Sequence, residues 1–212
     1  MKLILQLLLV SLVCQLTPAY AQTQFEKDLE AMRTIYLNAT DGEKRAVRKA
    51  IRATTKLEHK YRNRPLALAY KGGALALRGI NISKRPLDRM RETEEGLNLL
   101  DRALRKLSRN RGPEIEHIET RLVSAYVFIN LPDSVFHRLK EGSHLVRQLL
   151  DHPRFSELPQ GLQAAIYFAA ATSAEKFNNT QQFRHYLKLT TETDPDGLNG
   201  KEAAALLKKM EE

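Results

Sequence analysis

Cysteine is almost absent from this 212-residue sequence, and the only one is Cys14. It falls within residues 1–21, which have the pattern of an export signal: a positive start, an apolar run over 3–13 and the small-x-small triplet Ala19-Tyr20-Ala21. Cleavage after Ala21 would leave a mature chain without thiols. That chain would have no disulfide and no cysteine metal site.

Long apolar runs are also lacking. The run over 3–13 is shorter than the roughly 20 residues that a membrane-spanning helix needs. Val13 precedes Cys14, whereas a lipoprotein signal has a small residue at that place, so we do not expect lipid attachment. We therefore predict a cleaved signal at 1–21 and a single domain at 22–212 that is periplasmic or secreted.

Acidic residues are scarce in one part of the chain. The formal net charge is +9, and residues 43–111 contain 20 Lys and Arg against 7 Asp and Glu. This region favours an encounter with an anionic membrane surface, an anionic glycan or an acidic partner. The alternative is that its charges simply solvate helix faces. Nucleic acid is not expected as a partner, because the protein is expected to be exported.

Strand patterns are missing from the mature chain, where apolar residues recur at helical spacing instead. The fold class we predict is all-α. Met90 and Ile115 are among the residues expected to point inward. Helices are expected over residues 25–38, 43–61, 66–80, 86–107, 114–131, 134–150, 160–177, 181–191 and 201–210.

Three prolines recur at a regular spacing. Pro65, Pro113 and Pro159 each begin the first helix of an expected hairpin, and they are 48 and 46 residues apart. Proline suits a helix start because its missing N–H would have no partner there. The spacing predicts stacked helical hairpins, which form a right-handed solenoid with capping helices at its ends.

Part of the third unit matches a known repeat. Tyr167, Ala171 and Pro195 occupy its first aromatic, small and closing proline positions, so residues 164–195 resemble a tetratricopeptide repeat (TPR). The match is degenerate, since the sequence departs from the repeat at Ala174, Phe183 and Thr190.

A broader likeness covers residues 65–136. This segment resembles a family of exported or membrane-anchored bacterial proteins with TPR-like folds. The resemblance implies a TPR-like fold and an envelope setting, and it supplies no catalytic residue. The motifs that carry it are Tyr70-x-Gly72, Gly96-Leu97-x-Leu99-Leu100-Asp101-x-Ala103, Ile118-x-x-Arg121-Leu122 and Leu131-Pro132-x-x-x-Phe136.

The best metal-ligand pattern is His137-x-x-x-Glu141-x-x-His144. On one helix these side chains share a face and offer imidazole and carboxylate ligands. That face lies opposite the apolar stripe, so it would point to water without groups to orient the ligands. We therefore expect no metal site here.

Patterns of enzyme chemistry are absent as well. Ser124 and Ser173 lie in apolar helices without a nucleophile turn, and we interpret them as packing residues. Gly72-Gly73 lacks the other residues of a phosphate loop, so it indicates close helix contact. Glu114, Glu116 and Glu119 complement the positive start of their helix. The sequence thus predicts neither enzymatic activity nor a cofactor.

The remaining candidate is a binding groove. The first helices of stacked hairpins line the concave wall, so their polar and aromatic residues are candidate contacts for a protein or peptide in the cell envelope. The three tyrosines among them could instead be core residues whose hydroxyls reach a partner. A second hypothesis is a lipid or small-ligand carrier, with the small-residue helices 66–80 and 160–177 around an apolar cavity. The candidate contact residues are Tyr70, Arg78, Tyr126, Asn130 and Tyr167.

Overall fold

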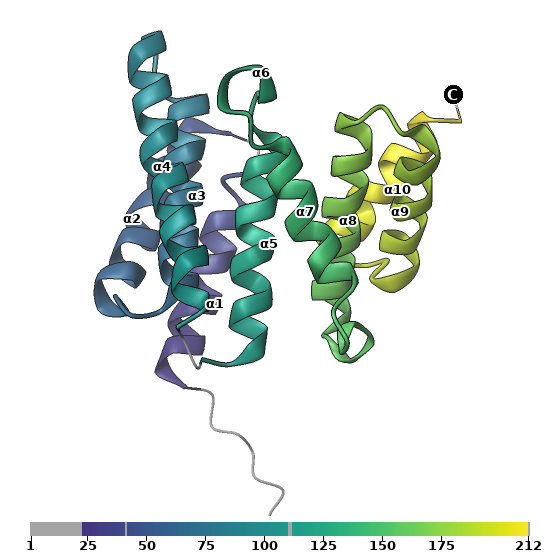
Figure 1. The fold of residues 1–212 in the computed structure, drawn as a ribbon, viewed down its shortest axis with the longest axis horizontal. Coiled ribbons are helices and arrows are strands. Elements are labelled where there is room, and N and C mark those ends of the chain that lie inside the picture. Colours follow the sequence, from purple (N-terminus) through teal and green to yellow (C-terminus); the bar gives the residue numbers. More distant parts are fainter. Residues whose placement is uncertain (1–22, 41, 110–111, 212) are drawn as a thin grey trace, which may run out of the picture.

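The computed structural model describes residues 23–40, 42–109 and 112–211, and in these ranges every regular element is a helix. The all-α prediction is therefore confirmed (Figure 1). The expected signal at 1–21 lies outside the described residues. The elements are α1 (Gln24–Leu37), α2 (Lys44–Lys60), α3 (Pro65–Asn81), α4 (Pro86–Leu107), α5 (Glu114–Asn130), α6 (Asp133–Phe136), α7 (Leu139–Leu150), the 3-10 helix η1 (Phe155–Glu157), α8 (Gln160–Lys176), α9 (Thr180–Thr193) and α10 (Leu198–Lys209).

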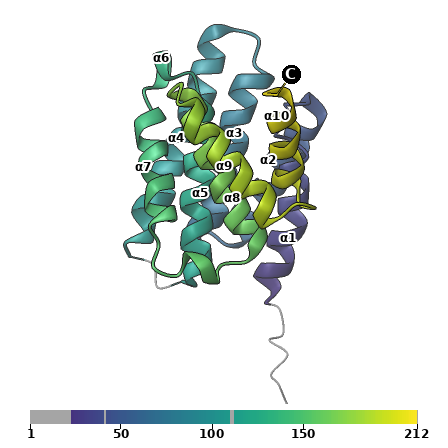
Figure 2. The same cartoon turned by 90° about the vertical axis from the view of Figure 1, so that its right-hand side faces the viewer.

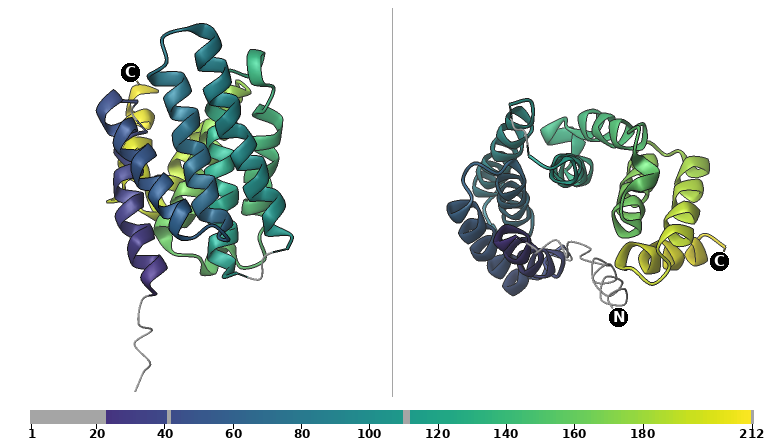
Figure 3. Two further views of the ribbon diagram at one scale, coloured as in Figure 1. Left: turned by 90° about the vertical axis from the view of Figure 1, so that its left-hand side faces the viewer. Right: turned by 90° about the horizontal axis from the view of Figure 1, so that it is seen from below.

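The helices pack mostly against their neighbours in sequence. The pairs α1–α2, α3–α4, α5–α7 and α8–α9 form antiparallel hairpins, and α10 packs on α9 and α8 (Figures 1 and 2). Seen from below, the helices follow an open arc, with α1, α5 and α8 on its inner side and α2 and α9 on its outer side (Figure 3). The turns within all four hairpins lie along the same edge of the arc, at the top of Figure 1.

Local sequence signals set the helix starts. The Thr23 hydroxyl accepts the backbone N–H of Glu26, whose carboxylate accepts the N–H of Thr23, so α1 begins with a capping box. Pro65 and Pro86 occupy the first turns of α3 and α4, where a missing N–H costs nothing.

Glycines allow α3 and α4 to approach closely. A Cβ atom on Gly96 would lie 2.6 Å from the carbonyl oxygen of Gly72 and 2.7 Å from the backbone nitrogen of Ala76. A Cβ on Gly72 would lie 2.8 Å from the carbonyl oxygen of Gly96. Real Cβ contacts are longer than this, so the two backbones meet where side chains are missing. Close helix contact is what the small residues of α3 predict.

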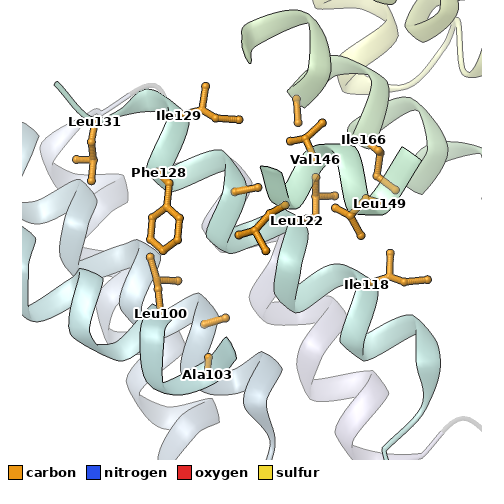
Figure 4. Packing of buried hydrophobic residues seen from close by; sticks show 14 of the residues in the cluster. Leu100, Ala103, Ile118, Leu122, Phe128, Ile129, Leu131, Val146, Leu149 and Ile166 are labelled. Carbon is orange, nitrogen blue, oxygen red and sulfur yellow. The ribbon is translucent and has the colours of Figure 1, made fainter. Parts of the chain in front are cut away.

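The largest apolar cluster lies where α5 meets α4, α7 and α8 (Figure 4). Phe128 and Ile129 of α5 are almost fully buried there, together with Leu100 of α4. A second cluster joins α1, α2 and α3, and a third joins α8, α9 and α10. Val123 packs against the first and second clusters and Tyr126 against the first and third, so α5 reaches all three.

Several expectations need correction. The helix expected over 134–150 is divided into α6 and α7, because His137 has a left-handed backbone with φ 52°. Asp133 accepts the backbone N–H of Leu139 at 2.9 Å and so holds the start of α7 after the break. Met90 and Ile115 were expected to point inward, but they are 45% and 39% exposed.

Candidate functional site

A buried carboxylate joins three helices near the inner side of the arc. Glu119 of α5 accepts hydrogen bonds at Oε1 from the Tyr70 hydroxyl of α3, at 2.5 Å, and from Arg33 Nε of α1, at 2.7 Å. Arg33 Nη2 also donates to its Oε2. Both carboxylate oxygens are thus engaged, by a planar guanidinium on one side and a phenol on the other.

Burial and pairing set the ionisation of this cluster. Burial works against the charge of Arg33, but the Glu119 carboxylate outweighs it and holds the pKa of Arg33 above its usual range. Burial and the same carboxylate raise the pKa of Tyr70 well above its ordinary value. The phenol therefore stays neutral and donates a hydrogen bond to the Glu119 carboxylate.

Glu116, one turn earlier on α5, is less completely paired. Arg64 Nη1, from the residue before α3, donates to its Oε1 at 2.5 Å. Its Oε2 is buried without a hydrogen-bond partner among the described residues. Burial raises the pKa of Glu116, the nearby Glu119 adds to the rise, and Arg64 opposes it. Glu116 is thus less completely hydrogen-bonded than its neighbour Glu119.

Glu119 belongs to a line of side chains along α5, which we call the inner stripe of α5. Its members are separated by three or four residues, so they fall on one face of the helix. Asn130 is exposed, Ile115 is 39% exposed, and Val123 and Tyr126 are half-buried. Glu119 lies beneath Arg33, whose side chain is 31% exposed. The inner stripe consists of Ile115, Glu119, Val123, Tyr126 and Asn130.

The structure places two candidate contact residues away from the inner stripe. Arg78 faces α4, where its Nε lies 3.1 Å from Glu92 Oε2 and its Nη2 lies 3.6 Å from Glu95 Oε2. Tyr167 is half-buried against the ring of Phe155, with centroids 5.2 Å apart, and stacks on Tyr186 of the outer helix α9. Both side chains therefore join the two helices of their own hairpins.

The other three candidates lie on or beside the inner stripe. Tyr70 is buried, and its hydroxyl donates a hydrogen bond to Glu119. This arrangement matches the alternative in which the tyrosine is a core residue whose hydroxyl reaches a partner. Tyr126 is half-buried and Asn130 is exposed one turn later. The amide of Asn130 donates to the carbonyl oxygen of Tyr126 at 2.8 Å. Tyr126 and Asn130 are thus the two candidates that the fold brings together on a solvent-facing part of α5.

The histidine pattern does not assemble as its spacing suggests. His137 precedes α7 in a left-handed conformation, whereas Glu141 and His144 lie within α7. Glu141 pairs with Arg138 at 2.9 Å, and His144 lies beside Gln148. In residues 23–40, 42–109 and 112–211, no cluster of three His, Cys, Asp or Glu side chains is arranged to hold a metal ion.

Two surface hollows are found elsewhere in the described chain. One, of 290 Å³, lies beside the α8–α9 turn and the end of α10. The other, of 390 Å³, opens between α5 and α7, where Glu114 lies 3.2 Å from His152 Nε2 and 2.9 Å from Arg154 Nη1. In that hollow, burial and the charge of Arg121 lower the pKa of His117, so its ring is neutral at pH 7. Neither hollow lies on the inner stripe.

Sequence reasoning missed the roles of Glu116 and Glu119. We interpreted both as partners of the helix start, whereas their side chains join α5 to α1 and α3. A signal was present: Glu119 is in register with Val123 and Tyr126 and so continues a partly apolar stripe. A charged residue in such a stripe requires a buried partner. That partner, Arg33, lies 86 residues away in the sequence. No local sequence pattern indicates which residue it is.

The comparisons add no relative to this picture. No protein-family model matches the sequence, and neither curated proteins nor solved structures give a match. Among the helices of the described residues, none combines the length and the apolar character needed to cross a membrane. The function therefore has to be inferred from the chain itself.

Proposed function

We propose that this protein is an exported, non-enzymatic interaction scaffold that binds a protein or peptide along the inner stripe of α5. In this proposal the hairpins form a TPR-like right-handed solenoid, and the chain is periplasmic or secreted after cleavage behind Ala21. The inner stripe is the single observation that carries the proposal. It offers apolar, aromatic and amide groups in one line on an inner helix of the arc.

The chemistry of the stripe suits a polypeptide. Asn130 offers both a donor and an acceptor to a main chain, although one of its N–H groups already bonds to Tyr126. Ile115, at the start of the stripe, and Val123, between Glu119 and Tyr126, offer apolar contacts. Tyrosine is enriched in interfaces because it combines a large apolar ring with a hydroxyl.

The buried hydroxyl and carboxyl groups support a non-enzymatic function. Ser124 Oγ donates to the carbonyl oxygen of Thr120 at 2.9 Å, and Ser173 Oγ lies 2.7 Å from Ser143 Oγ. Both carboxylate oxygens of Glu119 accept hydrogen bonds, from Arg33 and Tyr70. These groups satisfy one another inside the fold and leave no nucleophile beside a base.

The carrier hypothesis has less support. It required the small residues of α3 and α8 to leave space for an apolar ligand. Gly72 and Gly96 instead bring α3 and α4 into contact. Ala164 and Ala169 of α8 are fully buried, and Ala169 belongs to the largest apolar cluster. We therefore retain the scaffold as the proposed function.

Photo-crosslinking tests the proposal with two matched asparagines. A benzoylphenylalanine residue at position 130 should crosslink one partner from an extract of the producing cell, and excess unlabelled protein should compete for it. The same residue at position 98, where an exposed asparagine lies on α4, serves as the control. The proposal fails if Asn130→benzoylphenylalanine gives no saturable product, or the same products as the control.

A second pair of variants tests the stripe without a crosslinker. Ile115→Asp places a charge at the first position of the inner stripe and should weaken capture of that partner at least tenfold. Leu198→Asp does the same at the exposed start of α10, where Leu198 is 59% exposed, and should leave capture unchanged. Equal loss in both variants would point to a non-specific effect of charge.

A further inference from the structure

The basic region 43–111 is divided by the fold into paired and unpaired cations. Lys60 pairs with Asp28, Arg64 with Glu116, Lys71 with Glu58, and Arg78 with Glu92. These cations connect neighbouring elements of the fold. Apart from the half-buried Lys106, the other cations of this region that the structure describes are exposed, and they are not distributed evenly.

The first concentration is the outer face of α2. This helix buries Val47, Ala50, Thr54 and Leu57 and exposes six cations on its other side. At 100° per residue the six fall within an arc of about 140°. None takes part in an ion pair within the described ranges. They are Lys44, Arg45, Arg48, Lys49, Arg52 and Lys56.

The second concentration lies in the turn between α3 and α4 and the first turn of α4. Lys84, Arg85 and Arg89 are exposed there, and no ion pair of the described chain involves them. Between them lies Leu87, which is 82% exposed, and Met90 follows at 45%. Both are exposed apolar side chains with a cation one or two residues away.

The two groups of exposed cations meet along the edge of the arc where the hairpin turns lie. A Cβ atom on Gly42, just before α2, would lie 2.5 Å from Asn81 Oδ1 at the end of α3. The start of α2 is therefore next to the α3–α4 turn. We call this region the basic tip, and it consists of Lys44, Arg45, Arg48, Lys84, Arg85, Leu87, Arg89 and Met90.

Two acidic residues that the structure describes beside the basic tip, Glu43 and Asp88, are already engaged. Glu43 caps α2 by accepting the backbone N–H of Ala46 at 2.7 Å. Asp88 lies 3.3 Å from Arg91 Nη2. The tip thus keeps a net positive charge around its apolar residues.

We propose that the basic tip docks peripherally on an anionic lipid bilayer, with Leu87 and Met90 entering the interfacial layer and the surrounding cations contacting headgroups. This goes beyond the proposed function, because it assigns a different ligand to a different part of the chain. The basic tip is strongly cationic, whereas the inner stripe offers apolar, aromatic and amide groups. Peripheral binding agrees with the finding that no described helix is built to span a membrane.

The arrangement favours a bilayer over an acidic protein. A bilayer presents apolar and anionic layers a few ångströms apart, which matches a protruding leucine with cations on either side. Each Lys or Arg near an anionic bilayer contributes about 1 kcal/mol, which is a factor of about five in affinity. One or two apolar side chains give only weak binding to a bilayer by themselves. Docking therefore needs the apolar residues and the cations together.

Vesicle sedimentation with charge variants tests the assignment. The protein should bind vesicles of phosphatidylcholine mixed with phosphatidylglycerol at least tenfold more tightly than pure phosphatidylcholine, and added salt should weaken binding. Lys84→Ala with Arg85→Ala should reduce affinity roughly tenfold to thirtyfold. Arg102→Ala with Arg105→Ala removes the same charge from exposed positions at the other end of α4, and should change affinity less than about twofold.

A fluorescent probe tests whether the apolar residues enter the bilayer. The sequence contains no tryptophan, so Leu87→Trp and Leu198→Trp each introduce a single reporter at an exposed leucine. Emission of Leu87→Trp should shift to shorter wavelength, and be quenched by brominated lipid, only with anionic vesicles. Leu198→Trp, at the start of α10, should show neither change.

Four results would overturn the proposal. They are equal binding to neutral and anionic vesicles, equal losses in the two charge variants, identical behaviour of the two tryptophan probes, and capture of an acidic protein by the tip without vesicle binding. Ile115→Asp should leave vesicle binding unchanged, so a failure of the membrane proposal and a failure of the scaffold proposal are distinguishable.

Discussion

The α3–α4 and α8–α9 hairpins have the same topology but are held together by different contacts. In α3–α4 the backbones touch at Gly72 and Gly96, where a Cβ would meet main-chain atoms at 2.6–2.8 Å. In α8–α9 the helices are joined by rings, with Tyr167 and Tyr186 stacked at a centroid distance of 6.4 Å. Backbone contacts cannot rearrange, whereas ring contacts can, so the two hairpins should differ sharply in their tolerance of substitution.

A second contrast lies on α5, between two glutamates one turn apart. Glu119 has both oxygens satisfied by Arg33 and Tyr70, and Glu116 has one satisfied by Arg64. The two residues have the same chemistry and similar burial. Because an unpaired buried carboxylate oxygen costs free energy, we expect Glu119 to stabilise the fold more than Glu116 does.

The largest effect is expected at the α3–α4 contact. Gly96→Ala should lower the free energy of unfolding by about 2–3 kcal/mol, because the new methyl group meets the backbone of α3. The matched substitution is Gly161→Ala in the first turn of α8, where the new Cβ lies 3.4 Å from Asp194 Oδ2. It should be neutral or stabilising by about 0.5 kcal/mol. Urea unfolding followed by circular dichroism measures both, and equal costs would remove the contrast between the hairpins.

The next effect is expected at Glu119. Glu119→Gln keeps the shape but removes the charge that faces Arg33, and should cost about 2 kcal/mol. The value is below that of a fully buried pair, because Arg33 is 31% exposed and water can partly replace the carboxylate. The same unfolding measurement applies, and a cost below about 0.5 kcal/mol would mean that the cluster contributes little.

A smaller effect is expected in the ring contacts of the C-terminal hairpin. Tyr167→Ala should cost about 1.5 kcal/mol, through the lost contacts with Phe155 and Tyr186. Tyr167→Phe keeps the ring and should cost less than about 0.5 kcal/mol. If the two variants were equally destabilised, the hydroxyl rather than the ring would be the stabilising group.

The smallest effect is expected at Glu116, and it depends on pH. At pH 7, Glu116→Gln should be neutral or stabilising by less than about 1 kcal/mol, because the folded protein holds an under-paired charge there. The pKa of Glu116 is raised above its ordinary 4.5 in the folded state, so the wild type recovers this cost as pH falls through that raised pKa. Unfolding free energies at several pH values should show the advantage of the variant shrinking towards pH 4.5. An advantage that grew towards acid would contradict the sign of the shift.

The sequence predicted the fold well where local signals decide it. Proline at helix starts indicated the hairpins, and the glycines at 72 and 73 indicated the close approach of helices. It failed at His137, because the break between α6 and α7 depends on the Asp133 side chain and on a left-handed backbone that a helical pattern does not reveal. The candidate site was harder, since the Arg33–Glu119 pair joins residues 86 positions apart. Arg78 and Tyr167 show the same difficulty. The sequence shows that both side chains are polar, but it does not show that each contacts the second helix of its own hairpin.

The position of α5 has a consequence for how the protein unfolds. In a linear helical repeat each unit touches only its neighbours, so the ends can fray while the middle stays folded. Here Val123 and Tyr126 connect all three apolar clusters through one helix. Loss of α5 would expose every cluster at once, and loss of any cluster would weaken the packing of α5. The chain should therefore unfold in one cooperative transition, with amide hydrogen exchange slowest in α5 and similar limiting protection in the hairpins on either side.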